Sequence, residues 1–459
     1  MPARSAIPGL AWPPIADAAT AEVLALAWQL ERTQWWPAER LAAAQRTQLA
    51  EVVRHAATTT LLYGERFAAA GLAADDAAGA ERLVADAGAW ARIPILTRHE
   101  LIDAGPRTLS RRYPVTHGGA PELTSSRSTG EPVRVRVPAI VDRFWKAITL
   151  RDHDWHGRDL SLRLAVIRHT EGAPPPDGAR AAGWGPATAG VAPDAPLSIL
   201  SVGSTTDQQV AWLLREDPAY LLVYPTVLGA ILRELAATGA RLPSLRQVRT
   251  ISEALSADTR DLCREVLGVP LVDTYSAQEV GYLALQCPTG TGYHVQAERV
   301  LVEVLDDAGA PCPVGAIGRV VVTDLHNFAT PLLRYELGDH AEVGAPCPCG
   351  RGLPVLTRIV GRRRGMLRYP DGRTTWPLFT VACRRAAPYR ELQLVQESAD
   401  HLRLRVVPRP GTPITDAQRA ALADAVVDAL AHPFTVTVDV VSALGRSPAG
   451  KLEEFVSLV

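Results

Sequence analysis

The sequence predicts an α/β protein: a large N-terminal domain of mixed β-sheets flanked by helices, followed by a small α+β C-terminal domain. From about residue 122 onward, short β-rich runs alternate with helical patterns, as in YLLVY (220–224), then PTVLGAILRELAATG, then VRTIS. This alternation is typical of crossover units in a parallel or mixed sheet. The periodicity changes after residue 361, which indicates a second domain. The sequence has no repeat of fixed period, which argues against solenoids and propellers.

Length and composition limit the class of protein. The 459 residues allow two or three domains at roughly 150 residues each. Lys and Arg number 48 and Asp and Glu 49, a net charge of −1, so bulk charge recruits neither nucleic acid nor an acidic membrane surface. Hydrophobic residues make up 47% and charged residues 21%, the balance of a folded globular protein. With no apolar signal region and no long apolar run, we expect a cytoplasmic protein and no membrane partner.

The first 110 residues are expected to form a helical entry region. Apolar residues recur at helical spacing in two segments of residues 19–57. Thr97 and Glu100 form the S/T-x-x-E pattern of a capping box after the run IPIL. A hydroxyl and a carboxylate at this spacing can satisfy free backbone amides, so the pattern marks another helix start.

The predicted core strands follow in order along the chain. They are VRVRV (133–137), LRLAVI (162–167), LSILSV (197–202), YLLVY (220–224) and VPLVDTY (269–275). The segment 171–196 is rich in Pro, Gly and Ala, which favours an exposed connection over core structure; a substrate lid is the alternative. In the C-terminal domain, ELQLVQ and LRLRVVP read as strands, a helix opens at Thr415 and Gln418, and FTVTVDVV reads as a further strand.

Four short segments carry residues suited to nucleotide chemistry, and the first is TSSRSTGEP (124–132), on a tight connection between two strands. Its backbone amides could form a nest for phosphate oxygens, its hydroxyls add donors, and Gly130 allows close approach. An ordinary turn rich in Ser, Thr and Gly is the alternative. The candidate binding positions are Thr124, Ser125, Ser126, Arg127, Ser128, Thr129 and Gly130.

The second segment is DTYSAQEVG (273–281), at the end of the strand VPLVDTY. Open α/β sheets bind ligands at the carboxyl ends of their strands. Tyr275 could stack on a planar base, and Glu279 could hold Mg²⁺ through oxygen. A strand end with a solvated carboxylate is the alternative. Further candidate positions at this and neighbouring strand ends are Asp273, Ser276, Tyr224, Ser252, Glu253 and Ala254.

The third and fourth segments supply one carboxylate and one ammonium group. In TPLLRYELGDHAEV (330–343), Gly338 permits a turn that aims Asp339 away from the strand, where it could accept hydrogen bonds from a ribose diol. Near the end of the chain, Lys451 follows Gly450 on an expected loop, where it could reach a phosphate or carboxylate oxygen. Simple turn chemistry and a solvated charge are the respective alternatives.

A cysteine and histidine set predicts a metal centre. Cys287 and His294 have C-x6-H spacing, and Cys347 and Cys349 have C-x-C spacing about fifty residues later. Three thiolates and one imidazole suit a closed tetrahedral zinc site with a structural role, which leaves no open coordination position for catalysis. Four unconnected side chains are the alternative.

The order of these segments resembles the adenylate-forming superfamily, most closely its phenylacetate:coenzyme A ligase branch, over nearly the whole chain. TSSRSTGEP is similar to that family's TSGSTGEP-type phosphate loop, DTYSAQE to its YGxTE segment, and RYELGD to its YxTGD segment. IVGRRRG is similar to the GRxDD hinge and SPAGK to the catalytic-lysine motif. WWPAERLAAAQRTQLAEVVRHA and IPILTRHEL stand where this branch carries its helical N-terminal region. Some members also carry a zinc knot at matching positions.

The resemblance implies an ATP-dependent, AMP-forming acid–thiol ligase. In such enzymes a carboxylate attacks the ATP α-phosphate to give an acyl adenylate and pyrophosphate, and a thiol then displaces AMP. It implies that the phosphate loop holds the β- and γ-phosphates, that Glu279 with Mg²⁺ neutralises their charge, and that Tyr275 stacks on adenine. Asp339 and Arg362 would bind the ribose. Lys451 would act from a mobile C-terminal domain (362–459), with residues 1–361 as the adenylation domain.

The branch favours a small aromatic or heteroaromatic acid as substrate. The acceptor could be coenzyme A, a carrier-protein phosphopantetheine or an amine, and the protein could be a monomer or a homodimer. A nucleotide-binding homologue with impaired catalysis is a further alternative. No GxSxG elbow, Rossmann fingerprint, Walker A lysine loop or HExxH pair occurs, so those chemistries lack support.

The sequence departs from the family pattern at several positions. Arg127 stands where Gly is usual, Gln278 where Thr is usual, Ser276 where Gly is usual, and Glu131 where many members have Lys. Arg364 and Gly365 occupy the positions of the hinge acids, so the resemblance supports adenylation better than thiol transfer.

Two other clusters have simple interpretations. His153 and His156 read as a charged helix end rather than a catalytic cluster, and GRRRGMLR reads as a solvated basic loop rather than a coenzyme A phosphate site.

Overall fold

The computed structural model describes the chain in seven ranges: residues 5–124, 132–170, 172–362, 365–377, 379–409, 411–446 and 452–459. It separates into two compact units, and each unit is assembled from three segments of the chain. Unit 1 comprises Met1–Leu162, Ala182–Pro196 and Asp273–Ile359. Unit 2 comprises Arg163–Ala181, Leu197–Val272 and Val360–Val459. The domain boundary expected at residue 361 stays a prediction.

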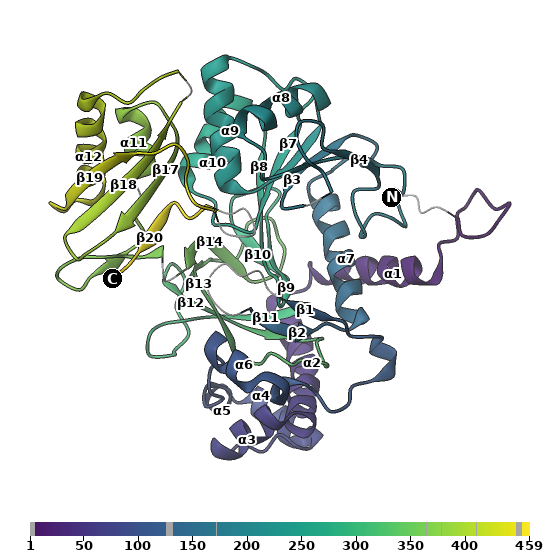
Figure 1. The fold of residues 1–459 in the computed structure, drawn as a ribbon. Coiled ribbons are helices and arrows are strands. Elements are labelled where there is room, and N and C mark those ends of the chain that lie inside the picture. The colour runs from purple at the N-terminus through teal and green to yellow at the C-terminus, as the bar shows by residue number, and fades with distance from the viewer. Residues whose placement is uncertain are drawn as a thin grey trace. The chain divides into compact units, whose positions relative to one another are not determined.

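Helices dominate the N-terminal part of unit 1 (Figure 1). They are α1 (Ala18–Thr33), α2 (Ala38–Thr59), α3 (Leu61–Ala69), α4 (Ala77–Ala85), α5 (Ala87–Ala91), α6 (Arg98–Ala104) and α7 (Ala139–Trp155). Two short 3₁₀ turns, Gly105–Thr108 and Val115–His117, follow α6. The capping box of Thr97 and Glu100 opens α6 as predicted, with both reciprocal hydrogen bonds present.

The strands of unit 1 form a mainly antiparallel array in the order β11-β12-β13-β14-β10-β9-β8, with a separate β1-β2 hairpin. Their bounds are β1 (Glu122–Thr124), β2 (Arg134–Arg136), β8 (Leu271–Ala277), β9 (Gly281–Gln286), β10 (Tyr293–Val295), β11 (Val300–Leu305), β12 (Ile317–Asp324), β13 (Tyr335–Val343) and β14 (Val355–Arg362). The antiparallel pairs β8-β9, β9-β10, β10-β14, β11-β12 and β12-β13 bring residues far apart in the sequence to one array.

One hydrophobic core joins the entry helices of unit 1 to these strands. Val52, Val53 and Tyr63 from α2 and α3 are fully buried in the same cluster as Val320 and Tyr335 from β12 and β13. Side chains of α2 also satisfy distant backbone groups: Gln45 Nε2 donates to Ala297 O at 2.8 Å, and Gln48 Nε2 to Leu325 O at 2.9 Å. The entry helices are therefore part of the core of unit 1.

Unit 2 contains the parallel strands, in the order β7-β6-β3-β5-β4. The pairs β3-β5, β3-β6 and β6-β7 are parallel, and helices α8, α9 and α10 lie between successive strands along the chain, which confirms the predicted crossover units (Figure 1). The bounds are β3 (Leu164–Arg168), β4 (Ala179–Ala182), β5 (Pro196–Ser201), α8 (Thr206–Glu216), β6 (Tyr220–Val223), α9 (Pro225–Thr238), β7 (Gln247–Ile251) and α10 (Ala257–Leu267).

The segment 171–196 needs a correction, because it is more than an exposed connection. It contains strand β4, and it buries Trp184 to 9% exposure. The Trp184 indole Nε1 lies 3.2 Å from both Leu162 O and Pro196 O. Pro and Gly enrichment identified the turns but gave no signal for the one large side chain that anchors the segment.

The C-terminal part of unit 2 has the predicted α+β composition. Its sheet has the order β19-β18-β17-β20, and α11 and α12 cover a core of its own that includes Leu394, Leu404 and Leu422 (Figure 1). The capping box of Thr415 and Gln418 is confirmed at the start of α12. The bounds are β15 (Leu367–Arg368), β16 (Thr374–Thr375), α11 (Thr380–Ala386), β17 (Tyr389–Gln396), β18 (His401–Pro408), α12 (Asp416–Leu430), β19 (Thr435–Val440) and β20 (Phe455–Ser457).

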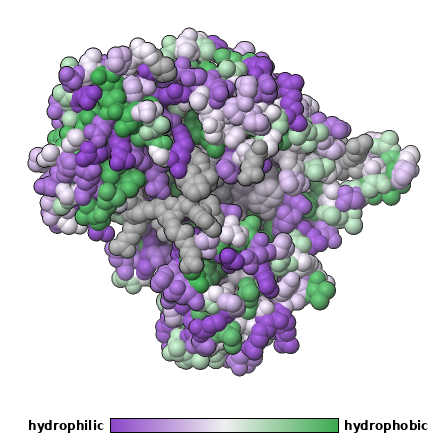
Figure 2. Space-filling view, viewed as in Figure 1, coloured by the Kyte–Doolittle hydropathy of each residue, from purple (hydrophilic) through white to green (hydrophobic). Residues whose placement is uncertain are grey.

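The face shown in Figure 2 mixes hydrophilic and hydrophobic residues in small groups. Hydrophobic side chains are conspicuous in the N-terminal segment before α1, where Ile7, Trp12 and Ile15 are 48%, 84% and 55% exposed. Among the described residues, no helix combines the length and apolar character needed to cross a bilayer.

Candidate active site and metal centre

Glu279, the predicted Mg²⁺ ligand, lies in unit 1 between a hydroxyl and a guanidinium group. Tyr335 Oη donates a hydrogen bond to Glu279 Oε1 at 3.1 Å, and Arg98 Nη1 lies 3.6 Å from the same oxygen. Burial raises the pKa of Tyr335, so its hydroxyl stays protonated and remains a donor. The carboxylate is therefore held in place without being fully enclosed, with its side chain 11% exposed.

Tyr275 and Asp339 are brought together from strands β8 and β13. Tyr275 Oη donates to Asp339 Oδ2 at 3.0 Å, although 64 positions separate the two residues in the sequence. Both strands are irregular at this point: the β8-β9 register shifts between Tyr275 and Ser276, and the β12-β13 register shifts opposite residues 337–339. β-Bulges of this kind re-aim side chains next to functional sites.

The bulge in β13 corrects one expectation. The turn expected at Gly338 does not form, since β13 continues through this residue to Val343. Instead Gly338 adopts a φ of +79° inside the strand, a conformation that a residue with a side chain rarely takes. A bulge within a continuous strand thus takes the place of the predicted turn before Asp339.

Gln278 links this group to the start of the predicted phosphate loop. Its amide Nε2 donates to Thr124 O at 3.0 Å, which joins the β8-β9 connection to the end of β1. The loop positions Ser125, Ser126, Arg127, Ser128, Thr129 and Gly130, together with Glu131, lie outside the described residues, as do Arg364 and Lys451. The amide at position 278 thus makes a contact between two segments of the chain.

Asp273 and Ser276 differ in their surroundings. Asp273 is 4% exposed; its backbone amide donates to Gln286 Oε1 at 2.9 Å, and its Oδ2 accepts from Tyr293 Oη at 2.7 Å. Ser276 is half-buried and pairs with Tyr282 across the β8-β9 register shift. Of these two candidates, Ser276 is the more open to a ligand.

The other predicted strand-end residues lie in unit 2, after β7. Ser252 has a φ of +72°, which is unusual for a serine and marks backbone strain of a kind that clusters at functional sites. Glu253 Oε2 accepts from Thr226 N at 3.0 Å and from Thr226 Oγ1 at 2.8 Å, so it fixes the start of α9. Ala254 follows on the same strand end, Tyr224 is buried at the end of β6, and Arg362 is the last residue of β14.

The four predicted metal ligands meet in unit 1. One ligand atom from each of Cys287, His294, Cys347 and Cys349 lies within 4.8 Å of every other. Cys287 Sγ is 3.7 Å from Cys347 Sγ, and Cys349 Sγ is 3.3 Å from His294 Nε2. Zn–S bonds of about 2.3 Å place tetrahedral ligand atoms roughly 3.8 Å apart, so the four residues fit this ion.

The chemistry of the four ligands also suits a metal cation. Burial lowers the pKa of His294 to about 4, which keeps the imidazole neutral and able to coordinate. Burial raises the pKa of the Cys349 thiol, but hydrogen bonds with Arg351, Cys347 and Cys287 together bring it below its ordinary value. Burial and the neighbouring thiols raise the pKa of Cys347 to about 11, so this thiol ionises at neutral pH only with a cation beside it.

Arg351 connects the metal centre to the N-terminal helices. Its guanidinium lies over the Trp35 ring at 4.6 Å and the Trp155 ring at 4.3 Å, and its Nε donates to Gln34 Oε1 at 2.8 Å. Gly352 N donates to Gln34 O at 2.9 Å. The only signal for this role in the sequence is the position of Arg351 next to the CPCG motif.

The residues around His153 occupy a more buried place than expected. Helix α7 ends at Trp155, which confirms the predicted helix end. However, Asp152 and His153 are 0% and 2% exposed, and Arg158 Nη1 lies 2.5 Å from Asp152 Oδ2. The cluster is a buried ion pair that closes the end of the helix, and it contains none of the other predicted site residues.

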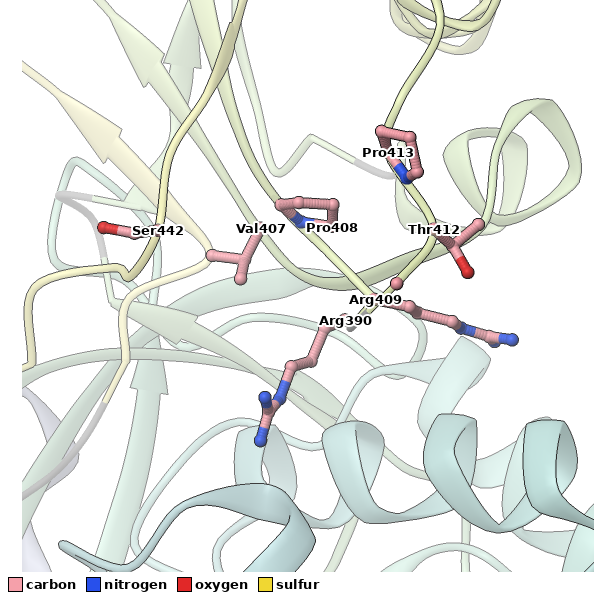
Figure 3. Close-up of a pocket in the computed structure, with 8 residues that line it drawn as sticks. Arg390, Val407, Pro408, Arg409, Thr412, Pro413 and Ser442 are labelled. Atoms are coloured by element: carbon pink, nitrogen blue, oxygen red, sulfur yellow. The ribbon is translucent and has the colours of Figure 1, made fainter.

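A separate cavity of about 480 Å³ opens in the C-terminal part of unit 2 (Figure 3). Arg390, Arg409, Thr412 and Ser442 supply its polar lining. The two guanidinium groups point in different directions in Figure 3 and do not converge on one position. None of the predicted site residues lines this cavity, so it does not form part of the candidate site.

Comparison by sequence finds one curated relative. The chain is 29% identical over 172 residues to a phenylacetate-coenzyme A ligase from Thermus thermophilus. The match spans 36% of this chain and 39% of the relative's length. No protein-family profile matches the chain.

Comparison by structure finds several CoA ligases. A 2-hydroxyisobutyryl-CoA ligase bound to an acyl adenylate superposes with a TM-score of 0.71 at 20% identity, covering 93% of this chain and 91% of that one. An anthranilate CoA ligase gives 0.52 at 17% identity, covering 72% and 65% of the two chains. A benzoate CoA ligase from Burkholderia xenovorans gives 0.50 at 17% identity, covering 70% and 66%. The fold is that of the adenylate-forming acyl-CoA ligases.

Proposed function

We propose that the protein is an AMP-forming ligase that activates a carboxylic acid with ATP and passes the acyl group to coenzyme A. One observation carries the proposal: the fold brings two separate motifs together, with Tyr275 bonded to Asp339 and Tyr335 bonded to Glu279. These residues come from the segments that resemble the YGxTE and YxTGD motifs. The likeness to acyl-CoA ligases over 93% of the chain supports the same assignment.

In the first half-reaction, a carboxylate oxygen of the acid attacks the α-phosphorus of ATP, and pyrophosphate leaves. Tyr275 would stack on adenine, Asp339 and Arg362 would accept and donate hydrogen bonds at the ribose, and Glu279 would hold Mg²⁺, which supplies positive charge beside the phosphates. Thr124 and the loop after it would bind the distal phosphates. Lys451 would contact the carboxylate and phosphate oxygens, where fixed positive charge is usually the largest catalytic effect.

In the second half-reaction, the thiol sulfur attacks the acyl carbon, the bond to the phosphate oxygen breaks, and AMP leaves. Coenzyme A is the acceptor we favour, because every relative named above is a CoA ligase. A carrier-protein phosphopantetheine or an amine remains the alternative acceptor. The names of three of the relatives, which act on phenylacetate, anthranilate and benzoate, support an aromatic acid as substrate.

A pyrophosphate-release screen across aryl, alkyl and amino acids, with and without coenzyme A, tests the proposal. We expect release with an aromatic acid and thioester formation when coenzyme A is added. Adenylation followed by transfer to an amine alone would support the alternative acceptor. ATP binding without release for any acid would identify an impaired homologue.

Substitution of the predicted catalytic lysine gives a sharper test, because the sequence contains only two lysines, Lys146 and Lys451. Lys451→Ala is expected to reduce pyrophosphate release at least about 100-fold, since one fixed donor contributes roughly 3 to 4 kcal/mol to the transition state. Lys146→Ala is the matched control: this lysine pairs with Asp142 at 2.7 Å on helix α7 and should leave the rate unchanged. An unchanged rate in Lys451→Ala would contradict the assignment.

We further propose a structural zinc ion at Cys287, His294, Cys347 and Cys349. A site assembled only in the folded chain converts metal affinity into folding free energy. We expect about one zinc per chain by elemental analysis and a melting temperature that falls on chelation. Cys347→Ser should lose the metal, whereas Cys312→Ser, outside the cluster, should keep it. A metal-free protein with an unchanged melting temperature would refute the site.

A further inference from the structure

The contact of Arg98 with Glu279 has no place in the roles assigned above. Arg98 lies at the start of α6, in the segment IPILTRHEL, and its Nη1 is 3.6 Å from Glu279 Oε1. It also interacts with the Tyr335 hydroxyl that holds the same carboxylate. The Arg98 side chain is 34% exposed, against 11% for Glu279, so the cation is on the more open side of the pair.

Backbone contacts fix the position from which Arg98 reaches Glu279. Leu96 forms a parallel bridge to Tyr335, with Leu96 N donating to Arg334 O and Glu336 N donating to Leu96 O, both at 2.9 Å. The capping box of Thr97 and Glu100 then sets the first turn of α6. The carboxylate, the hydroxyl and the guanidinium are thus tied to one stretch of β13.

A resident guanidinium next to a magnesium-binding carboxylate creates a charge conflict once the metal arrives. Two cations cannot share one carboxylate without repulsion, and a nucleotide brings several negative phosphate oxygens to the same place. A guanidinium binds phosphate oxygens through directed, charge-assisted hydrogen bonds. Arg98 is half-buried on the open side of its pair with Glu279, so its guanidinium can exchange a carboxylate oxygen for a phosphate oxygen.

We propose that Arg98 is a phosphate-binding residue of the nucleotide site: it neutralises Glu279 in the empty protein and turns to the distal phosphates of ATP when Mg²⁺ occupies Glu279. This inference rests on the proposed function. It adds to that site a cation from the N-terminal helical region, which the predicted roles do not include.

The test measures binding without turnover. The parent protein, Arg98→Gln and Arg98→Lys are titrated by calorimetry with MgATP and, separately, with AMP, in the absence of any acid. Loss of a charged hydrogen bond costs about 1.5 to 3 kcal/mol, so Arg98→Gln should bind MgATP at least about tenfold more weakly. AMP lacks the distal phosphates, so its affinity should not change. Arg98→Lys keeps the charge and should recover part of the MgATP affinity.

Arg66→Gln is the matched control. Arg66 Nη2 donates to Pro94 O and Ile95 O at 2.8 Å, and Arg66 pairs with Glu100, but no described contact joins it to Glu279. It therefore disturbs the same segment without removing the proposed ligand. We expect Arg66→Gln to lower the melting temperature while keeping the parent ratio of MgATP to AMP affinity.

The outcomes distinguish a wrong inference about Arg98 from a wrong proposed function. If Arg98→Gln binds MgATP as tightly as the parent, or loses MgATP and AMP affinity by the same factor, Arg98 is only a structural ion-pair partner and the inference is wrong. The same conclusion follows if Arg66→Gln shows the same selective loss. A parent protein that binds neither nucleotide would overturn the proposed function itself, and the inference with it.

Discussion

At the scale of single residues, two tyrosine hydroxyls hold two carboxylates of the candidate site. The Tyr275 hydroxyl donates to Asp339 and the Tyr335 hydroxyl donates to Glu279. Both tyrosines are buried, at 7% and 1% exposure respectively. A buried phenol is a rigid donor because its ring is fixed by packing and only the hydroxyl can rotate. The site therefore has preset carboxylate positions before any ligand binds.

Tyr275→Phe tests this preset arrangement. The variant keeps the ring and removes the hydrogen bond to Asp339, which at a charged acceptor is worth about 1.5 to 3 kcal/mol. We expect ATP affinity, measured by calorimetry, to fall about tenfold.

Tyr63→Phe provides the comparison, since Tyr63 Oη accepts a hydrogen bond from Leu333 N at 2.7 Å in the core of unit 1. It should lower the melting temperature and leave ATP affinity at the parent value. Parent-like affinity in Tyr275→Phe would show that Asp339 does not need this tyrosine.

At the scale of elements, the metal-ligand loop packs against the turn between α1 and α2. A Cβ atom on Gly352 would lie 1.9 Å from Trp36 O, so backbone meets backbone with no room for a side chain. Together with the stacking of Arg351 on Trp35, this contact makes the loop after Cys349 a support for the N-terminal helices.

Gly352→Ala is therefore expected to destabilise unit 1 by at least about 2 kcal/mol, as overpacking does when the neighbouring atom cannot move. Urea unfolding followed by tryptophan fluorescence measures the change. Gly290→Ala is the control, because a Cβ there meets nothing within 4 Å. Equal stability of the two variants would contradict the close packing.

Elements with a local signal could be predicted from the sequence, and those that depend on distant contacts could not. The capping boxes at Thr97 and Thr415 are confirmed because both partners lie within one helical turn. Strand β4 and buried Trp184 were missed, because Pro and Gly around them dominate the local pattern. For the site, the motif residues Tyr275, Glu279 and Asp339 could be found from the sequence. The contacts of Tyr335 and Arg98 with Glu279 could not, because they depend on tertiary structure.

At the scale of the whole molecule, the C-terminal part is predicted to be an independent domain. Its sheet, α11 and α12 enclose a hydrophobic cluster formed entirely by residues from 367 onward. A segment with its own core should fold alone.

A fragment of residues 365–459 is accordingly expected to melt cooperatively, as followed by far-UV circular dichroism. A variant fragment with Leu422→Ala removes part of this core. Its free energy of unfolding should fall by about 2 to 5 kcal/mol, so it should melt at a lower temperature. A gradual, non-cooperative melt of the parent fragment would show that the segment depends on the rest of the chain.

The discontinuous build of unit 1 also governs the order in which the chain can fold during synthesis. Helices α2 and α3 leave the ribosome early, but the groups they bond to, at Ala297, Leu325 and Leu333, are made more than 230 residues later. The last metal ligand, Cys349, follows later still. The N-terminal helices therefore stay without these bonding partners until most of the chain has been made.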